Sequence, residues 1–321
     1  MQGIRIRRYG GPEAMELEEV VLPEPGPAQA LVKVEFAGVN FYDTQQRSGF
    51  IKRDLPIAPG VEAAGTVEAA GAQAGVTPGM RVAWAQSPGS YATHALVERD
   101  RLVALPATVT SEQAAAVLFQ GMTAHHLACS TYPLEPGDAC FVHSAAGGVG
   151  GLLCQMAAMR GATVVGAVSS EAKAAIASEY ADHVLVYGRD DVIAETKRLT
   201  GGLGAHVVYD AVGKETFETS LGALRPRGLL AIYGEASGFI PPFDLRRLSA
   251  AGCVFITRTS LGSYIATRAE FLERAEAVLT WVGEGKLTPR IHGVYPLANA
   301  AEAHRALESR GTIGKVLLRC A

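Results

Sequence analysis

His143-Ser144-Ala145-Ala146-Gly147-Gly148-Val149-Gly150 is the stretch that decides the fold of this chain. Residues 139–142 before it are apolar and indicate a buried strand. A helical pattern follows, in which apolar residues recur on one face: Val149, Leu152, Leu153, Met156 and Ala157. A strand, a glycine turn and a helix N-terminus together form a phosphate site, because backbone N–H groups and the helix dipole favour negative charge. The stretch therefore predicts a dinucleotide-binding unit.

The glycines of this turn have separate predicted roles. Against the G-x-G-x-x-G pattern, Ala145 replaces the first glycine, while Gly147 and Gly150 are retained. Gly147 would let a pyrophosphate approach the backbone, and Gly150 would let the helix pack closely on the sheet. The turn lies near the middle of the chain, after about 120 residues. We therefore expect a nucleotide-binding domain inserted into another domain.

Size and composition are typical of a globular protein with two domains. The chain has 321 residues, of which 48% are hydrophobic and 19% charged, so each of two domains is large enough to bury a core. The net charge is −3 and no dense block of Lys and Arg occurs, which argues against a nucleic-acid partner. The N-terminus has no apolar segment behind its charges, so no secretory signal is expected.

Neither a membrane span nor a disulfide framework is expected. Residues 139–159 lack Asp, Glu, Lys and Arg and are long enough to cross a bilayer, but the break at Ala146-Gly147-Gly148 divides them into a strand and a short helix. The cysteines are odd in number and no two have C-x-x-C spacing: Cys129, Cys140, Cys154, Cys253 and Cys320. We therefore expect reduced thiols and a cytoplasmic protein.

Strand and helix patterns divide the chain into two parts. Up to Pro106, short strand patterns alternate with turn clusters, which predicts a small, partly open β-barrel. From Gly121, strands alternate with helices, and strands are expected at residues 140–143, 163–168, 183–186, 205–212, 229–233 and 253–257. Six such strands with crossover helices predict a doubly wound, parallel sheet.

The end of the chain is expected to rejoin the first part. A helix is predicted near residues 268–282, and short strands such as residues 316–318 follow it. The predicted fold class is α/β. A barrel domain is expected from residues 1–120 and 260–321, and a doubly wound Rossmann domain with a six-stranded parallel sheet from residues 121–259.

The end of the second predicted strand indicates which dinucleotide binds. NAD-binding sheets carry an acidic residue there, which accepts a hydrogen bond from the adenosine ribose. Here Ser169 and Ser170 follow the strand, and no carboxylate occurs before Glu171. Hydroxyl groups and the nearby Lys173 suit a 2′-phosphate, so NADPH is expected rather than NADH. Tyr187, which closes the third strand, either covers the adenine or packs on the sheet.

With these residues in place, the chain resembles the zinc-free quinone oxidoreductase (zeta-crystallin-like) branch of the medium-chain dehydrogenase/reductase superfamily. The resemblance covers nearly the whole length and has several ordered motifs. They are Gly10-Gly11-Pro12-Glu13, Gly38-Val39-Asn40-Phe41-Tyr42-Asp43-Thr44, Pro59-Gly60-Val61-Glu62-Ala63-Ala64-Gly65, Ala145 to Gly150, Val208-Tyr209-Asp210-Ala211-Val212-Gly213 and Glu308-Ser309-Arg310. The resemblance implies a GroES-like barrel, formed by both chain ends, around an inserted Rossmann domain.

The resemblance also implies that no zinc is bound. Zinc-dependent relatives carry a catalytic Cys in the segment that matches residues 40–43 and a His in a Gly-His-Glu motif. This chain has no Cys in that segment, and Val61 stands at the His position. Glu62 remains, but one carboxylate does not complete a three-ligand site. The structural four-cysteine lobe is also missing, since no Cys precedes Cys129.

Cofactor contacts implied by the resemblance come from both predicted domains. They are Asn40, His125, Gly147, Gly148, Val149, Ser169, Lys173, Tyr187, Val212, Tyr233, Arg258 and Arg310. Of these, Ser169, Lys173 and Tyr187 correspond to the adenosine-phosphate cluster. Arg310 corresponds to an arginine that closes over the cofactor from the C-terminal segment.

Weak catalytic roles are expected for Tyr42 and Gln45. Tyr42 is expected either to donate a hydrogen bond to an acceptor oxygen or to pack under the cofactor. Gln45 stands where close relatives carry Tyr, and Gln120 stands where many carry Lys. Quinones are electron-poor, so positioning supplies most of the catalysis. His143, at the end of a central strand, is expected to be a core residue.

Three functions remain open from the sequence. The first is an NADPH:quinone oxidoreductase that works without zinc. The second is an NADPH-dependent reductase of α,β-unsaturated aldehydes or ketones, since hydride addition to an activated alkene uses the same geometry. The third is a non-catalytic, crystallin-like NADPH-binding protein. Resemblance also implies a homodimer in which the sixth Rossmann strand pairs across a two-fold axis.

Overall fold

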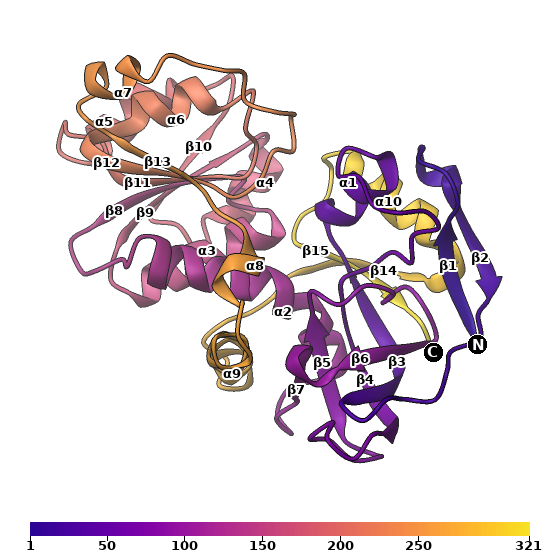
Figure 1. Cartoon of the computed structure of the whole chain (residues 1–321). Coiled ribbons are helices and arrows are strands. Elements are labelled where there is room, and N and C mark those ends of the chain that lie inside the picture. Colours follow the sequence, from indigo (N-terminus) through magenta and orange to yellow (C-terminus); the bar gives the residue numbers. More distant parts are fainter. The chain divides into compact units, whose positions relative to one another are not determined.

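The computed structural model describes all 321 residues, which form two compact units. Met1–Met122 and Ile265–Ala321 make the first unit, and Thr123–Tyr264 make the second. The chain passes from the first unit to the second inside helix α2 (Ser111–His126) and returns after the short helix α8 (Leu261–Tyr264). Figure 1 identifies the elements of each unit.

A seven-stranded sheet forms the centre of the first unit. Its order is β14-β15-β3-β4-β5-β7, with β6 paired to β3. The strands are β3 (Gln29–Val39), β4 (Glu62–Ala70), β5 (Arg81–Ala85), β6 (His94–Glu98), β7 (Leu102–Ala104), β14 (Ile291–Pro296) and β15 (Lys315–Arg319). Since β15 pairs antiparallel with β3, the prediction that the chain end returns to the first domain is confirmed.

Period-2 patterning explains the core of this sheet. Along β3 the side chains of Ala30, Val32 and Val34 are fully buried, because alternate residues of a strand face the same side. A separate hairpin pairs β1 (Gln2–Ile6) with β2 (Met15–Glu19). The unit also contains α1 (Phe41–Ser48), α9 (Arg268–Gly283), α10 (Ala300–Glu308) and the 3-10 helices Pro12–Ala14, Arg99–Arg101 and Leu297–Asn299.

The second unit is a six-stranded parallel sheet in the order β10-β9-β8-β11-β12-β13. Its strands are β8 (Ala139–His143), β9 (Thr163–Val168), β10 (His183–Val186), β11 (Ala205–Asp210), β12 (Leu224–Ile232) and β13 (Phe255–Arg258). Numbered from its own first strand, the order is 3-2-1-4-5-6, which is the doubly wound dinucleotide-binding arrangement. The predicted fold class is therefore confirmed.

Helices cover both faces of this parallel sheet. In Figure 1, α5 and α6 lie on one face and α3 on the opposite face. The helices are α3 (Gly148–Met159), α4 (Glu171–Ala177), α5 (Val192–Leu199), α6 (Phe217–Ala223), α7 (Arg246–Ala250) and α8, and a π-helix, Leu127–Thr131, follows α2. None of the helices is both long and apolar enough to cross a membrane.

Some predicted strand bounds were wrong, and turns explain two of them. The sixth strand begins at Phe255 rather than Cys253, because Gly252 and Cys253 have φ values of 99° and 57° and form a turn. The fourth strand ends at Asp210 rather than Val212, since the Asp210 carboxylate accepts the backbone N–H of Val212 at 2.7 Å. The fifth strand begins at Leu224 rather than Leu229.

Candidate functional site

The predicted phosphate turn forms at the end of β8, the first strand of the second unit. Gly147 N–H donates to the Ser144 carbonyl at 2.8 Å, and α3 begins at the next residue without a side-chain cap or an acidic residue in its first turn. Gly150 must be glycine, because a Cβ there would lie 2.2 Å from the Ser144 oxygen. The first N–H groups of α3, at Gly148 and Val149, therefore lie at an N-terminus that favours anions.

The ends of β9 and β10 lie side by side at the same edge of the sheet. Tyr187 N–H donates to the Val168 carbonyl at 3.0 Å, which places Tyr187 beside the exposed Ser169. Ser170 is the N-cap of α4, and its hydroxyl accepts the Lys173 backbone N–H at 3.4 Å. The Lys173 side chain is partly buried, which lowers its pKa. The structure thus places Ser169 and Tyr187 after neighbouring strands and Lys173 in the first turn of α4.

Arg189 is a residue of this edge that sequence reasoning missed. Its guanidinium forms an ion pair of 2.6 Å with Glu171, the first carboxylate after β9, and another of 2.6 Å with Asp190. The signal in the sequence was a cation two residues after the tyrosine that closes the third strand. Glu171, which opens α4 three residues after the end of β9, is therefore paired with a cation.

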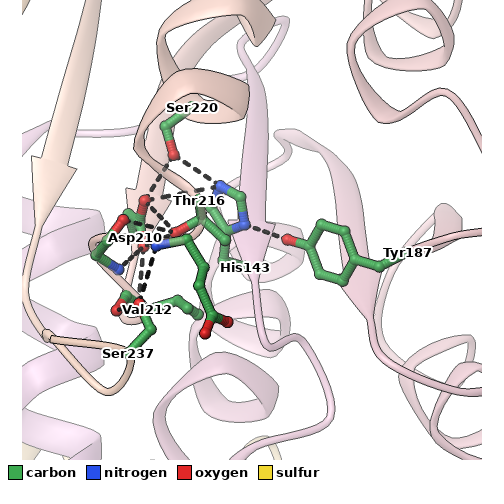
Figure 2. A network of polar contacts seen from close by, with 9 residues as sticks. His143, Tyr187, Asp210, Val212, Thr216, Ser220 and Ser237 are labelled. Carbon is green, nitrogen blue, oxygen red and sulfur yellow. Dashed lines mark hydrogen bonds and ion pairs between the residues drawn. The ribbon is translucent and has the colours of Figure 1, made fainter.

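A buried polar network runs beneath the same edge (Figure 2). The Asp210 carboxylate, at the end of β11, accepts the backbone N–H groups of Val212 and Gly213 at 2.7 and 3.0 Å. It also accepts the hydroxyl of Thr216 at 2.8 Å and that of Ser220, on α6, at 2.6 Å. The carboxylate therefore shapes the loop at Val212, a cofactor contact implied by the resemblance.

His143 links this carboxylate to Tyr187, as Figure 2 shows. Ser220 donates its only proton to Asp210, so its oxygen must accept the contact of 2.8 Å with His143 Nε2. The His143 proton is therefore on Nε2, and Nδ1 accepts the hydroxyl proton of Tyr187. Burial lowers the pKa of His143, which keeps the ring neutral, and the prediction of a core histidine is confirmed by its complete burial.

Tyr233, Arg258 and His125 lie elsewhere in the second unit. The Tyr233 hydroxyl is buried and has no hydrogen-bond partner in the protein, which is unusual for a buried polar group. Arg258, at the end of β13, forms an ion pair of 3.2 Å with Glu235. His125 is buried on α2, with 8% of its surface exposed.

Asn40, at the N-terminus of α1 in the first unit, has three side-chain hydrogen-bond partners. Its Nδ2 donates to Glu62 at 2.8 Å, and its Oδ1 accepts from Lys315 Nζ at 2.8 Å and from Gln120 Nε2 at 3.3 Å. Because Lys315 only donates, the orientation of the Asn40 amide is fixed. Gln120 Oε1 is itself buried without a protein partner. Gln120 Oε1 can therefore accept a further hydrogen bond.

A second buried chain of hydrogen bonds runs from Asn40 to the far side of α1. Asp43 Oδ2 accepts the Asn40 backbone N–H at 2.8 Å and the Tyr91 hydroxyl at 3.0 Å. Tyr91 contacts His304 Nε2 at 3.1 Å, and His304 Nδ1 accepts from Arg47 at 3.1 Å. Burial raises the pKa of Asp43 to about 7, while burial and the Arg47 charge lower the pKa of His304 to about 3.

The two predicted catalytic residues differ in their surroundings. Tyr42, on α1, accepts a hydrogen bond of 2.7 Å from Arg53 and packs its ring 6.4 Å from that of Phe119. Since a guanidinium only donates, the Tyr42 O–H proton is not used in this bond. Gln45, one turn along α1, is partly exposed.

Arg310, a predicted cofactor contact, is exposed after α10, with a φ of 58°.

Comparison with known proteins identifies the family. The alcohol dehydrogenase GroES-like domain profile matches residues 26–107, and the zinc-binding dehydrogenase profile matches residues 148–280. A quinone oxidoreductase of Pseudomonas aeruginosa is 40% identical, over 98% of both chains. The chain belongs to the quinone oxidoreductase family of medium-chain dehydrogenase/reductases.

Two further members of the family are informative. A 2-haloacrylate reductase from a Burkholderia species is 37% identical over 98% of this chain and 97% of its own. A mycobacterial protein solved in complex with NADPH is 42% identical and superposes with a TM-score of 0.96. That match covers 99% of this chain and all of the mycobacterial chain.

The residues of this family member do not fit a catalytic zinc ion. Val61, at the position of the expected histidine, is a buried apolar side chain. Glu62 has both oxygens engaged, Oε1 by Asn40 and Lys315 and Oε2 by the Phe119 N–H at 2.8 Å. Its charge is neutralised by a buried ammonium group, and neither Asn40 nor Lys315 is a typical zinc ligand.

Proposed function

We propose that this protein is an NADPH-dependent quinone oxidoreductase that works without zinc. The observation that carries the proposal is the match over nearly the whole chain to a quinone oxidoreductase and to an NADPH-bound family member with the same fold. The side chains at the expected zinc position support the zinc-free part of the proposal. Val61 offers no ligand atom there, and the Glu62 carboxylate is paired with Lys315.

The second unit has groups suited to each part of NADPH. The N-terminus of α3, with Gly147, Gly148 and Val149, would hold the pyrophosphate. Ser169, Lys173 and Tyr187 are assigned to the adenosine 2′-phosphate by resemblance. The unpartnered Tyr233 hydroxyl supports a polar ligand at the end of β12. Val212 and Arg258 are assigned to the nicotinamide side by resemblance, together with His125, and Asn40 and Arg310 of the first unit are assigned to the cofactor in the same way.

Bound NADPH supplies a hydride at its nicotinamide ring, and the protein must position the acceptor and assist its protonation. Tyr42 suits the second task, because its oxygen accepts from Arg53 while its proton remains available. We assign to Tyr42 a hydrogen bond to the acceptor oxygen, and to Gln45 a polar contact beside it. Without a metal ion, positioning supplies most of the rate enhancement.

Turnover with a panel of acceptors tests this function. Ortho- and para-quinones should be reduced with NADPH, more slowly with NADH, and with no loss of rate after treatment with a zinc chelator. Tight NADPH binding without reduction of any acceptor would instead support a non-catalytic NADPH-binding protein. Oxidation of primary alcohols after addition of zinc would contradict the zinc-free proposal.

A second candidate is favoured by one relative. The Burkholderia 2-haloacrylate reductase matches this chain over nearly its whole length, and its name describes reduction of an activated alkene rather than a quinone. We therefore add 2-haloacrylate and a 2-alkenal to the panel. A kcat/KM for either alkene above that for every quinone would replace the first candidate with a reductase of α,β-unsaturated acceptors.

We also propose a cytoplasmic homodimer. Strand β13 is an edge of the parallel sheet, and Phe255 on it is 62% exposed, as are Phe239 (61%) and Leu245 (71%) of the same unit. An apolar edge of this kind is typically covered by a second chain. No disulfide joins the five cysteines, which suits a reducing compartment. Sedimentation equilibrium should give twice the chain mass, and Phe255→Glu should give the monomer.

A further inference from the structure

We propose that Arg189 is a specificity-determining residue for the cofactor, binding the adenosine 2′-phosphate with one edge of its guanidinium. The inference rests on the proposed use of NADPH. It adds to the predicted cluster of Ser169, Lys173 and Tyr187 a residue from the loop after β10. It also gives a role to the ion pair between Arg189 and Glu171, which the proposed function does not use.

The loop that carries Arg189 is rigid at its base. Arg189 and Asp190 both donate their backbone N–H groups to the Val186 carbonyl, at 3.1 and 3.0 Å. Asp190 Oδ2 accepts the Val186 N–H at 2.7 Å. Tyr187, at the start of the loop, is anchored to the buried His143 (Figure 2). The backbone of Arg189 is therefore fixed beside the end of β9, because β9 and β10 are hydrogen-bonded neighbours.

The guanidinium has one firmly held edge and one loosely held edge. Nε and Nη2 bind the two oxygens of Asp190 at 2.9 and 2.6 Å, and the Asp190 side chain is only 20% exposed. Nη1 binds Glu171 at 2.6 Å, and the Glu171 side chain is 70% exposed. Asp190 thus orients Arg189, while Glu171 is a solvated partner at the edge that faces α4.

An incoming phosphate can take the place of the Glu171 carboxylate. Exposed ion pairs between single charges contribute little, since water screens them and two side chains must be ordered. A 2′-phosphate carries nearly two negative charges and several acceptor oxygens, and arginine binds phosphate with strong, oriented hydrogen bonds. The Glu171 carboxylate therefore stands where a phosphate oxygen of NADPH would bind.

The same ion pair disfavours NADH. In NAD-binding sheets a carboxylate near this position accepts the ribose 2′-OH. Here Glu171 is the first carboxylate after β9, and Arg189 draws it away from that role. Arg189 consequently favours NADPH over NADH in two ways. It supplies positive charge to the phosphate, and it keeps Glu171 from accepting a hydrogen bond from the ribose hydroxyl.

Equilibrium binding of NADPH, NADH and adenosine 2′,5′-bisphosphate, followed by fluorescence or calorimetry, tests the proposal without turnover. Arg189→Gln should weaken binding of NADPH and of the bisphosphate about tenfold, and change NADH less than twofold. Glu171→Gln should act in the opposite direction and tighten NADPH about twofold, because the competing anion is lost. Arg189→Lys should recover only part of the affinity, since an ammonium cannot bind Asp190 and phosphate side by side.

Matched controls come from α5, in the same unit. Arg198 and Glu195 also form a partly exposed ion pair between an arginine and a glutamate, with 65% and 35% of their side chains exposed. Arg198→Gln and Glu195→Gln change the net charge identically and should leave all three affinities unchanged. If Arg198→Gln weakens NADPH as much as Arg189→Gln does, the effect is one of overall charge and the proposal is wrong.

The wild-type protein separates this inference from the proposed function. If it binds NADPH no more tightly than NADH, the proposed cofactor is wrong and Arg189 has no phosphate to select. If it prefers NADPH and Arg189→Gln keeps the same ratio of the two dissociation constants, the cofactor stands and the role of Arg189 is refuted. Melting temperatures of all variants should lie near that of the wild type, since the exchanged side chains are largely solvated.

Discussion

Each unit links a histidine, a tyrosine and an aspartate in one hydrogen-bonded group, yet the two aspartates differ in their partners. In the first unit the residues are Asp43, Tyr91 and His304, and in the second they are Asp210, Tyr187 and His143. Each tyrosine contacts its histidine. The difference lies in what surrounds the aspartate, and it shows how one set of residue types serves two tasks.

In the second unit the aspartate is saturated with donors. Asp210 accepts two backbone N–H groups and the hydroxyls of Thr216 and Ser220. These hydrogen bonds satisfy both oxygens of the buried carboxylate. The group therefore acts as a rigid connection between the loop after β11 and Tyr187, both of which we assign to the cofactor.

In the first unit the aspartate has donors on one oxygen only. Asp43 Oδ2 binds Asn40 and Tyr91, whereas Oδ1 is buried without a partner. Burial then raises the pKa of Asp43 to about 7. Lys315 lowers the pKa of Asp43 only in part, and Arg47 contacts His304, whose pKa it lowers.

The largest expected effect tests the buried ion pair of the first unit, between Lys315 and Glu62. Lys315→Met leaves Glu62 buried without its cation, and we expect the free energy of unfolding to fall by about 3–5 kcal/mol. Chemical denaturation measures this loss. The double variant Glu62→Gln/Lys315→Met should recover most of it, because no unpaired charge remains. A loss below about 1 kcal/mol in the single variant would show that the pair is not buried in solution.

Two variants test the opposing pKa shifts of the first group. The pKa of Asp43 rises from 3.8 to about 7 on folding, so its contribution to stability is full below pH 4 and is lost as pH rises to 7. The pKa of His304 falls from 6.5 to about 3, so its contribution is full above pH 6.5 and is lost as pH falls. The two slopes therefore oppose each other in the wild type.

Replacing either residue should reveal the pH dependence that the other residue gives to the free energy of unfolding. Between pH 4.5 and 7, Asp43→Asn should make the free energy of unfolding rise with pH relative to the wild type, and His304→Gln should make it fall. Each change is of the order of 3–4 kcal/mol, since one pKa unit corresponds to about 1.4 kcal/mol. Denaturation curves at several pH values measure the slopes. Parallel curves for all three proteins would contradict the shifts.

The smallest expected effect compares the two tyrosines. Tyr91→Phe removes a donor from the Asp43 carboxylate and should cost about 2 kcal/mol, whereas Tyr187→Phe removes a bond to the neutral His143 and should cost about 1 kcal/mol. Both rings keep their packing. Thermal denaturation of the two variants shows which loses more stability. An equal loss would mean that the charge of the tyrosine's partner does not distinguish the two groups.

Local sequence patterns were sufficient to predict the fold of the second unit and the position of its glycine turn. The glycine turn and the hydroxyl-rich end of β9 are contiguous in sequence, so their conformation follows from residues a few positions apart. Strand bounds failed at Cys253, where a turn delays the start of β13, and at Val212, where a side-chain hydrogen bond ends β11. Arg189 was missed because its partner Glu171 lies 18 positions earlier, on the neighbouring strand–helix connection.

By itself the sequence determined the fold class, the family and the expected cofactor, because these depend on ordered local motifs. Only the tertiary structure decided which charges meet. Lys315 and Glu62 are 253 positions apart, and Tyr91 and His304 are 213 apart. Periodicity predicts that such residues face inward, but not which partner they find there. That choice depends on the strand pairing of both chain ends, which brings β15 against β3 and thereby places Lys315 beside Asn40.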